Sequence, residues 1–136
     1  MSNDNEAIEL AHRLFDAARA GDNAVLAPYL EAGAPANLTN ASGDTLLMLA
    51  AYHGNAATVE LLLKHGADVE ASNDRGQTPL AGAVFKGYTE VARLLLDGGA
   101  DPAAGTPSAA DTAAMFQRTD IQALIEERRS GTSAAS

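Results

Sequence analysis

The sequence predicts an all-α solenoid in which short helix-turn-helix units stack side by side, with turn-forming fingers between consecutive units. The first observation is an internal duplication: segment 40–72 aligns without a gap on segment 73–105, and 13 of the 33 aligned residues are identical. Unrelated segments of ordinary composition would share roughly two or three. The second observation is that glycines recur at the same places in both copies. A period of this length is typical of repeat proteins whose units contact only their neighbours.

The composition supports small, closely packed helices. Hydrophobic residues make up 46% of the 136 residues, but aromatic residues only 4%, and Trp is absent. The core must therefore consist mainly of Leu, Ala, Val and Ile. A chain of this length is expected to form one domain, whose core is spread along the stack.

The charge balance is acidic, with 18 Asp and Glu against nine Lys and Arg, and a formal charge of −9. Negative charge over most of the surface repels phosphate backbones, so nucleic acid is not an expected partner. The absence of Cys excludes disulfide and thiol chemistry. The beginning of the chain is polar and no stretch approaches 18 apolar residues, so we expect a soluble cytoplasmic protein with no membrane partner.

The first unit, about 5–39, is predicted to contain helices over 5–20 and 25–32, with apolar residues at helical spacing. It matches the full repeats at a distance of 33 residues, and we interpret it as a diverged N-terminal cap. Pro28 lies beyond the first turn of the second helix, so this helix either starts late or bends. The expected exposed face of the first helix carries Glu6, Glu9, Arg13, Asp16 and Arg19.

The two full repeats, 40–72 and 73–105, are each predicted to fold as two short helices. Thr45 can cap the first helix of one repeat, and Pro79 occupies the first helical position in the other. The predicted helices are 46–53 and 57–65 in the first full repeat, and 79–86 and 89–98 in the second.

Glycines and turn-forming residues mark the ends of these helices. Gly66 and Gly99 follow the last turns, where a positive φ is favourable only for glycine. Turn-forming residues at 40–43 and 73–76 bend the fingers.

The last unit, about 106–129, aligns with the repeat before it when the period is shortened to 30. Gln117 then occupies the position of the glycine between the two helices. The repeat domain is expected to span 1–129, and 130–136 to form a disordered tail. The predicted helices of this C-terminal cap are 109–117 and 120–129.

Both full repeats resemble the ankyrin repeat, whose pattern has a Gly-x-Thr-Pro-Leu opening, a Gly between two helices and a Leu-Leu-Leu-x-x-Gly-Ala-Asp close. The chain departs from it at Met48 and Ala81, which replace the family's His, and at Leu46, which replaces a Pro. These departures concern local hydrogen bonding and helix initiation. Such a small chain also resembles stand-alone ankyrin proteins of bacteria. The matching residues are Gly43-Asp44-Thr45-Leu46-Leu47, Gly54 and Leu61-Leu62-Leu63-Lys64-His65-Gly66-Ala67-Asp68, then Gly76-Gln77-Thr78-Pro79-Leu80, Gly87 and Leu94-Leu95-Leu96-Asp97-Gly98-Gly99-Ala100-Asp101.

Residue patterns for catalysis or metal binding are not evident. His12, His53 and His65 have no partner at a metal-ligand spacing, and Asp68 and Asp101 fit turn hydrogen bonds of the repeat. No glycine-rich phosphate loop occurs, and no serine has a candidate base that the sequence would place beside it. We therefore expect no enzyme activity, no cofactor and no metal.

The resemblance implies that a protein partner binds at the finger tips and at the exposed ends of the first helices, which together form a concave groove. Tyr52 and Phe85 are the most informative positions, because aromatic residues ringed by polar ones are typical of interface hot spots. Either ring could instead fold onto the neighbouring repeat, and Phe116 is expected in the core. The basic Arg75 and Lys86 suit an acidic patch on the partner. The candidate partner-binding residues are Ser42, Asp44, Tyr52, His53, Asp74, Arg75, Gln77, Phe85, Lys86 and Met115.

Taken together, the sequence favours a non-catalytic protein-protein interaction module whose partner it does not identify. The alternative is a dedicated inhibitor, or a protective or regulatory partner, of a single enzyme, and resemblance to a family does not choose between these roles. A small-molecule binder would need a convergent polar pocket that the pattern lacks. We expect a monomer, although the sequence leaves open whether the caps pair.

Overall fold

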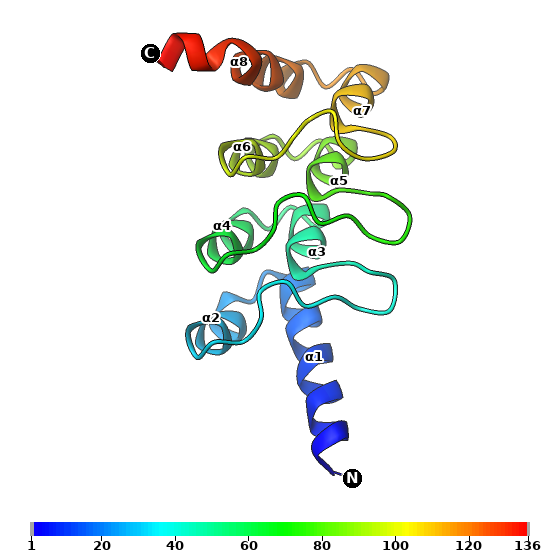
Figure 1. Ribbon diagram of the computed structural model, residues 1–136, viewed down its shortest axis with the longest axis vertical. Helices are drawn as coiled ribbons and strands as arrows, with labels where there is room; N and C mark the ends of the chain where they lie inside the picture. Colours follow the sequence, from blue (N-terminus) through cyan, green and yellow to red (C-terminus); the bar gives the residue numbers. More distant parts are fainter. Residues whose placement is uncertain (1, 136) are drawn as a thin grey trace.

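The computed structural model describes the backbone of residues 2–135 and the side chains of residues 6–128. Within this range the chain forms eight helices, arranged as four pairs that stack in one column (Figure 1). Each pair is called a unit here, numbered 1 to 4 along the chain. The helices are α1 (Ser2–Ala20), α2 (Asn23–Glu31), α3 (Leu46–Tyr52), α4 (Ala56–Lys64), α5 (Pro79–Lys86), α6 (Thr89–Asp97), α7 (Ala109–Met115) and α8 (Thr119–Ala135).

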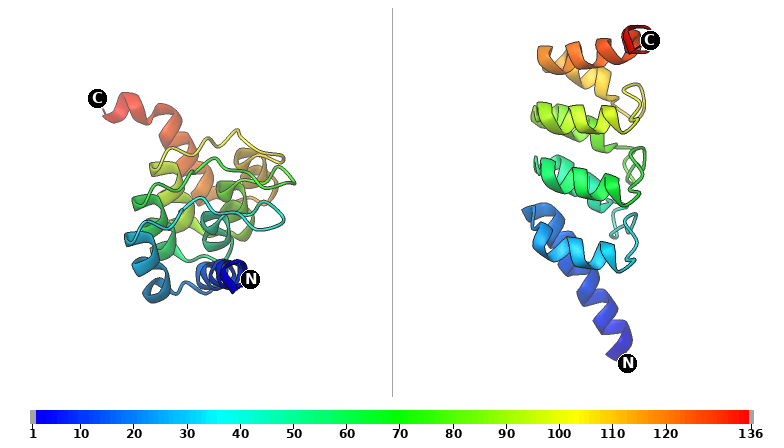
Figure 2. Two further views of the ribbon diagram at one scale, coloured as in Figure 1. Left: turned by 60° about the horizontal axis from the view of Figure 1, so that its bottom comes forward. Right: turned by 90° about the vertical axis from the view of Figure 1, so that its left-hand side faces the viewer.

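The units form two layers of helices with the fingers along one edge (Figure 2). The first helices of the pairs, α1, α3, α5 and α7, contact one another in sequence, and so do the second helices, α2, α4, α6 and α8. The predicted all-α solenoid is confirmed. Each finger joins a second helix to the first helix of the next unit, so all fingers project on the same side.

One continuous apolar core runs through the stack. Its centre consists of leucines from successive units, among them Leu47, Leu62, Leu80 and Leu95, all of which are buried. Burying each such side chain contributes about 1.5–3 kcal/mol to folding. Alanines at one register of the first helices allow the close packing that a core without Trp requires. These alanines are Ala17, Ala50, Ala83 and Ala113.

Each of the first helices α3, α5 and α7 begins at a buried hydroxyl. The side-chain oxygens of Thr45, Thr78 and Ser108 accept the backbone N–H three residues later, at 3.0, 3.2 and 3.1 Å. A cap of this kind is worth about 1 kcal/mol. Thr45 and Pro79 therefore initiate helices as predicted, and Leu46, which stands where the family has Pro, is buried in the core.

Left-handed backbone separates the two helices of each unit. Gly54 and Gly87 have φ values of 74° and 79°, and Gln117 adopts the same region with φ 54°. The prediction that Gln117 takes the inter-helix glycine position is confirmed. Gly66 and Gly99 also have positive φ, at 88° and 100°. A Cβ on either would meet nothing within 4 Å, so only backbone strain opposes substitution there.

The residue after the inter-helix position ties each unit to the one before it. Asn55 donates from Nδ2 to the carbonyl oxygens of Ala18 and Arg19, at 2.9 and 2.8 Å. Carbonyls in the last turn of a helix have no partner within that helix. Asn55 therefore caps the end of α1 from the neighbouring unit.

The same contact recurs at the other end of the stack, with a different side chain. Arg118 donates from Nε to the carbonyl of Val84 at 3.1 Å and from Nη2 to the carbonyl of Phe85 at 2.7 Å. In unit 3 Tyr88 holds this position. Its ring covers Gly54 of unit 2 so closely that a Cβ on Gly54 would lie 3.0 Å from the ring. Three different residues thus occupy the equivalent position at the three junctions between units.

The N-terminal unit differs from its prediction in helix α2. This helix begins at Asn23 and includes Pro28, so the late start, one of the two predicted alternatives, is wrong. The proline removes one helix hydrogen bond. That loss is offset by the Asp22 carboxylate, which accepts from the Val25 N–H at 3.4 Å, and by the buried Leu26.

Both ends of the stack extend beyond the predicted helices. Helix α1 starts at Ser2 and its N-terminal part projects past the other units (Figure 1). The backbone of α8 continues to Ala135, whereas the sequence predicts a helix over 120–129. The side chains from 129 onward, and all of residue 136, lie outside the described residues, so the predicted disordered tail 130–136 stays a prediction.

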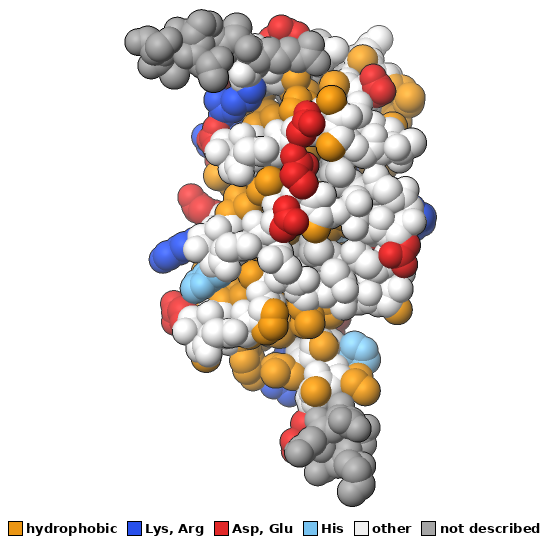
Figure 3. All heavy atoms as spheres, in the orientation of Figure 1, with side chains coloured by type: hydrophobic (Ala, Val, Ile, Leu, Met, Phe, Trp, Pro, Cys, Tyr) orange, Lys and Arg blue, Asp and Glu red, His pale blue; other side chains and the backbone are white. Residues whose placement is uncertain are grey.

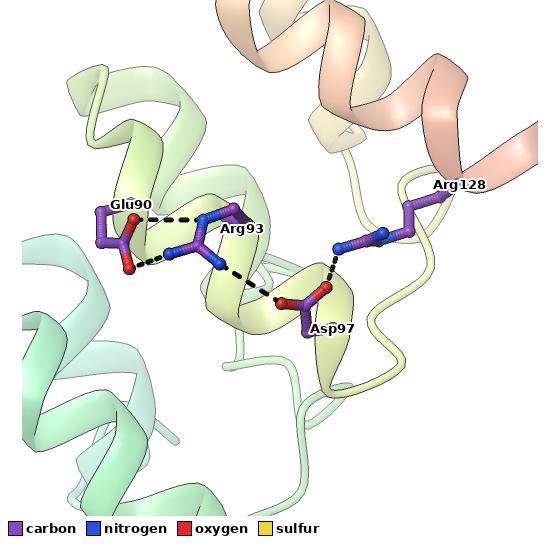
Figure 4. A network of polar contacts seen from close by, with 4 residues as sticks. All are labelled: Glu90, Arg93, Asp97 and Arg128. Atoms are coloured by element: carbon purple, nitrogen blue, oxygen red, sulfur yellow. Dashed lines mark hydrogen bonds and ion pairs between the residues drawn. The ribbon is translucent and has the colours of Figure 1, made fainter. Parts of the chain in front are cut away.

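A chain of charged side chains fastens the last unit to the third. Arg93 pairs with Glu90 and with Asp97 on α6, and Asp97 also pairs with Arg128 on α8 (Figure 4). The hydrogen bond from Arg93 lowers the pKa of the Glu90 carboxyl below its ordinary value. The stabilisation from this pair is therefore present at neutral pH and is lost as the pH falls through that lowered pKa. Being exposed, such pairs contribute little individually.

Replacing Gln117 by glycine is expected to stabilise the protein. A left-handed residue other than glycine costs about 1–2 kcal/mol. Glycine removes this strain but increases the conformational entropy of the unfolded chain, which offsets part of the gain. We therefore expect the free energy of unfolding to rise by about 1 kcal/mol. Urea unfolding followed by circular dichroism measures this change. Gln117→Ala is the control, because alanine retains the strain. An equal effect of both substitutions would contradict the assignment.

Asn55→Ala is expected to lower the free energy of unfolding by about 1–2 kcal/mol, because two carbonyls at the end of α1 lose their partner. The same urea titration tests it. Ser72→Ala, at an exposed finger position, is the control and should change stability by less than about 0.5 kcal/mol. Asn55→Asp, which cannot donate, should be no more stable than Asn55→Ala; full stability of the aspartate variant would refute the capping role.

Candidate functional site

A groove of about 640 Å³ runs along the concave side of the stack, between the fingers and the first helices. Helices α1, α3, α5 and α7 all contribute to it, and the finger before α5 forms part of its wall. Seven of the ten predicted partner-binding residues line this groove: Asp44, Tyr52, His53, Arg75, Gln77, Phe85 and Met115.

The other three predicted residues lie beside the groove. Ser42 lines a smaller neighbouring hollow, together with His12 and Arg19. Asp74 lies at the finger tip, where its backbone N–H donates to the Ser42 carbonyl at 3.1 Å. Lys86 extends from the end of α5 over the ring of Tyr52, with its Nζ 5.1 Å from the ring centre.

A row of large apolar side chains is exposed along the groove. Tyr52, Phe85 and Met115 occupy one register of α3, α5 and α7, and are 41%, 45% and 67% exposed. Both rings touch the following unit, Tyr52 beside Gly82 and Phe85 against Phe116, yet neither is buried by that contact. Their exposure matches the prediction, while their contact with a partner stays a prediction.

Phe116 is also exposed, at 44%, so its expected place in the core is wrong. It follows the last residue of α7, at the register where the two preceding units carry the exposed His53 and Lys86. Its ring packs edge-on against Phe85, with 5.2 Å between ring centres. Phe116 therefore lengthens the exposed apolar row.

The fingers are held in shape by two equivalent asparagines. The Oδ1 atoms of Asn40 and Asn73 each accept two backbone N–H groups of their own finger, at 2.9–3.0 Å. The Nδ2 of Asn73 donates to Asp44 at 2.9 Å and to Gln77 at 2.7 Å. The side chains of Asp44 and Gln77 are thus engaged within the fingers, where they build the groove wall.

Gly82 is the most informative groove residue that the sequence reasoning did not identify. It lies in the middle of α5 at the register of Leu49 and Thr112, and is only half-buried. Two features of the sequence could have identified Gly82. It aligns with Leu49 between two otherwise similar repeats, and it is a glycine inside a predicted helix. The other lining residues outside the prediction are Arg19, Met48, Leu49, Thr78, Ala81, Pro107, Thr112 and Phe116.

The described residues contain no group of three or more His, Cys, Asp or Glu side chains that could hold a metal ion. His53 packs edge-on against Tyr52 with 5.7 Å between ring centres, and His65 is the C-cap residue of α4. Asp68 and Asp101 each accept a backbone N–H two residues later, at 2.9 Å, as expected for turn residues. Among the described helices, none has the length and apolar content to cross a membrane.

Comparison with known proteins agrees with this architecture. The family described as Ankyrin repeats (3 copies) matches residues 14–106, which is more than half of the chain. A protein of Pseudomonas aeruginosa that carries the name ankyrin repeat protein is 52% identical over 52 residues. That match covers 38% of this chain and 30% of the relative, so the chain spans less than a third of that protein. From the repeat pattern, the stacked helix pairs and the family match together, the chain belongs to the ankyrin repeat family.

Proposed function

We propose that this chain is a non-catalytic interaction module that holds a segment of a partner protein in the concave groove. The observation that carries the proposal is the exposed row of Tyr52, Phe85, Met115 and Phe116. Large apolar side chains left uncovered together in a hollow are typical of protein-binding surfaces. Ankyrin repeats generally serve as protein-protein interaction modules, which agrees with this placement.

The groove is built from parts that hold their positions without a partner. The finger asparagines saturate backbone N–H groups, and Asn73 links its finger to Asp44 of the preceding finger. The helix ends carrying Phe85 are capped by Arg118 from the following unit. A binding surface that is already ordered loses little conformational entropy on association. This favours stable binding even of a short segment.

The module is proposed to act without catalysis, metal or cofactor. The groove combines aromatic, aliphatic, amide and a few charged side chains, and its histidine packs edge-on with the ring of Tyr52. Such a lining suits recognition of a polypeptide better than bond making or breaking. Adaptor and single-enzyme inhibitor are both compatible with it.

Removing the two central aromatics is expected to weaken partner binding while preserving the fold. In Tyr52→Ala/Phe85→Ala the loss of the Phe85–Phe116 contact should cost less than about 2 kcal/mol of stability, whereas interface aromatics of this kind carry roughly 30-fold or more in affinity. Affinity capture from the source cell, followed by mass spectrometry, compares the variant with the unmodified chain. Ile8→Ala is the control, because Ile8 is 55% exposed and lies outside the groove.

Undiminished capture by the double variant, or loss of its cooperative unfolding, would refute the groove assignment. The identity of the captured proteins separates the two roles. One enzyme retained in equal stoichiometry indicates a dedicated inhibitor or protective partner. Several partners that compete for the same groove indicate an adaptor.

A further inference from the structure

The groove has a local shape and a charge that specify its occupant more closely. Resting on the function proposed above, we propose that the groove receives an acidic segment of a partner protein. A bulky apolar side chain of this segment seats over Gly82, and flanking carboxylates pair with Arg75 and Lys86.

Gly82 creates a notch in the floor of the groove. The preceding and following units place Leu49 and Thr112 at this register, whereas Gly82 has no side chain. A Cβ built on Gly82 would meet only the ring of Tyr52 within 4 Å, at 3.5 Å. The Tyr52 ring therefore forms one wall of the notch, and no other group outside α5 lies within that distance.

The notch is surrounded by apolar groups. Tyr52 and Phe85 line the groove with Gly82, and Ala81 and Leu49 contribute aliphatic surface. Glycine inside a helix is unfavourable for the helix itself. Here it leaves an apolar hollow that a large aliphatic or aromatic side chain of the partner can fill, and such anchors seated in a pocket dominate binding energy.

Two basic side chains near the notch have no anionic partner. Within residues 6–128, neither Arg75 nor Lys86 takes part in an ion pair. Arg75 lines the groove from its finger, and Lys86 extends over Tyr52 from the end of α5. They approach the groove from its two walls. A segment lying between them is in position to present a carboxylate to each.

The carboxylate of the groove is already engaged. Among the described residues, Asp44 is the one acidic residue that lines the groove, and its two oxygens accept from Asn73 at 2.9 Å and from Asn40 at 3.5 Å. Arg19, the other cation of the lining, is paired with Asp16. Arg75 and Lys86 thus remain as the groove cations available to a partner.

The rest of the surface directs an acidic segment to this groove. The chain carries a formal charge of −9. Acidic side chains follow one another along the stack on the face shown in Figure 3. Asp68, Glu70 and Asp101 are exposed in the loops between units. An acidic segment is repelled there and attracted at the groove, so charge complementarity fixes where it binds.

The test uses a displayed library of random peptides, selected on the full chain. Enriched peptides are expected to carry net negative charge and at least one large aliphatic or aromatic residue. The best peptide is then synthesised with a fluorescent label, and its affinity is measured by anisotropy at two salt concentrations. Binding should weaken as salt rises, because the ion pairs lie at the edge of the groove.

Three variants locate the binding peptide. Gly82→Leu restores the residue that Leu49 supplies in the preceding unit, and should reduce affinity at least about tenfold while leaving the Tm equal or higher. Arg75→Gln/Lys86→Gln should reduce affinity at least about tenfold and diminish the salt dependence. Lys64→Gln/Arg93→Gln, which removes the same charge from α4 and α6, should bind the peptide like the unmodified chain.

The failure of this inference is distinguishable from failure of the proposed function. Neutral or basic enriched peptides, or an affinity unchanged in Arg75→Gln/Lys86→Gln, would overturn the acidic occupant. If Gly82→Leu and Tyr52→Ala/Phe85→Ala still prevent binding of those peptides, the groove function stands. Enriched peptides that bind both of these groove variants unchanged would contradict the groove function as well. A library that yields no enriched peptide overturns the inference.

Discussion

The ends of the first helices α1, α3 and α5 constrain the rest of this structure, because a residue of the next unit covers each of them. Asn55 and Arg118 meet this need by hydrogen bonds to the preceding unit, and Tyr88 instead covers the inter-helix glycine with its ring. These contacts thus join successive units at equivalent positions. Exposed residues of successive first helices fall into one row as a consequence, and this row borders the groove.

Much of the fold could be predicted because the duplicated residues are those whose physical roles are local. Thr45 and Thr78 cap helices through their own hydroxyls, and Pro79 sets a helical φ, so these starting points follow from the residues alone. The exposure of Tyr52 and Phe85 could be predicted as well, because register determines which face of a short helix points away from the stack.

The features that the sequence did not predict depend on contacts between units. Pro28 disrupts a helix locally, but the packing of Leu26 and Leu30 retains the helix across it. Phe116 is apolar, yet it occupies a register that is exposed in the two preceding units, at His53 and Lys86, so its apolar character did not indicate its place. The capping of carbonyls by Asn55 and Arg118 could not be predicted from the repeat pattern either, because two unlike side chains make the same contact with the preceding unit. The place of Gly82 depends on Tyr52 of the preceding unit, which lines the groove beside it.

Gln117 lowers the local stability of the last unit relative to the units that carry glycine at this position. Its left-handed backbone retains a strain that the glycines of the other units avoid, and among the described residues α7 and α8 are covered by a neighbouring unit on one side only. In a linear array, local opening begins where the sum of unit and interface stabilities is smallest. We therefore expect the C-terminal unit to open more readily than the two internal units, and Met115 and Phe116 would leave the groove with it. The length of the exposed apolar row would then depend on a local folding equilibrium, which a segment bound as proposed would shift toward the closed, four-unit form.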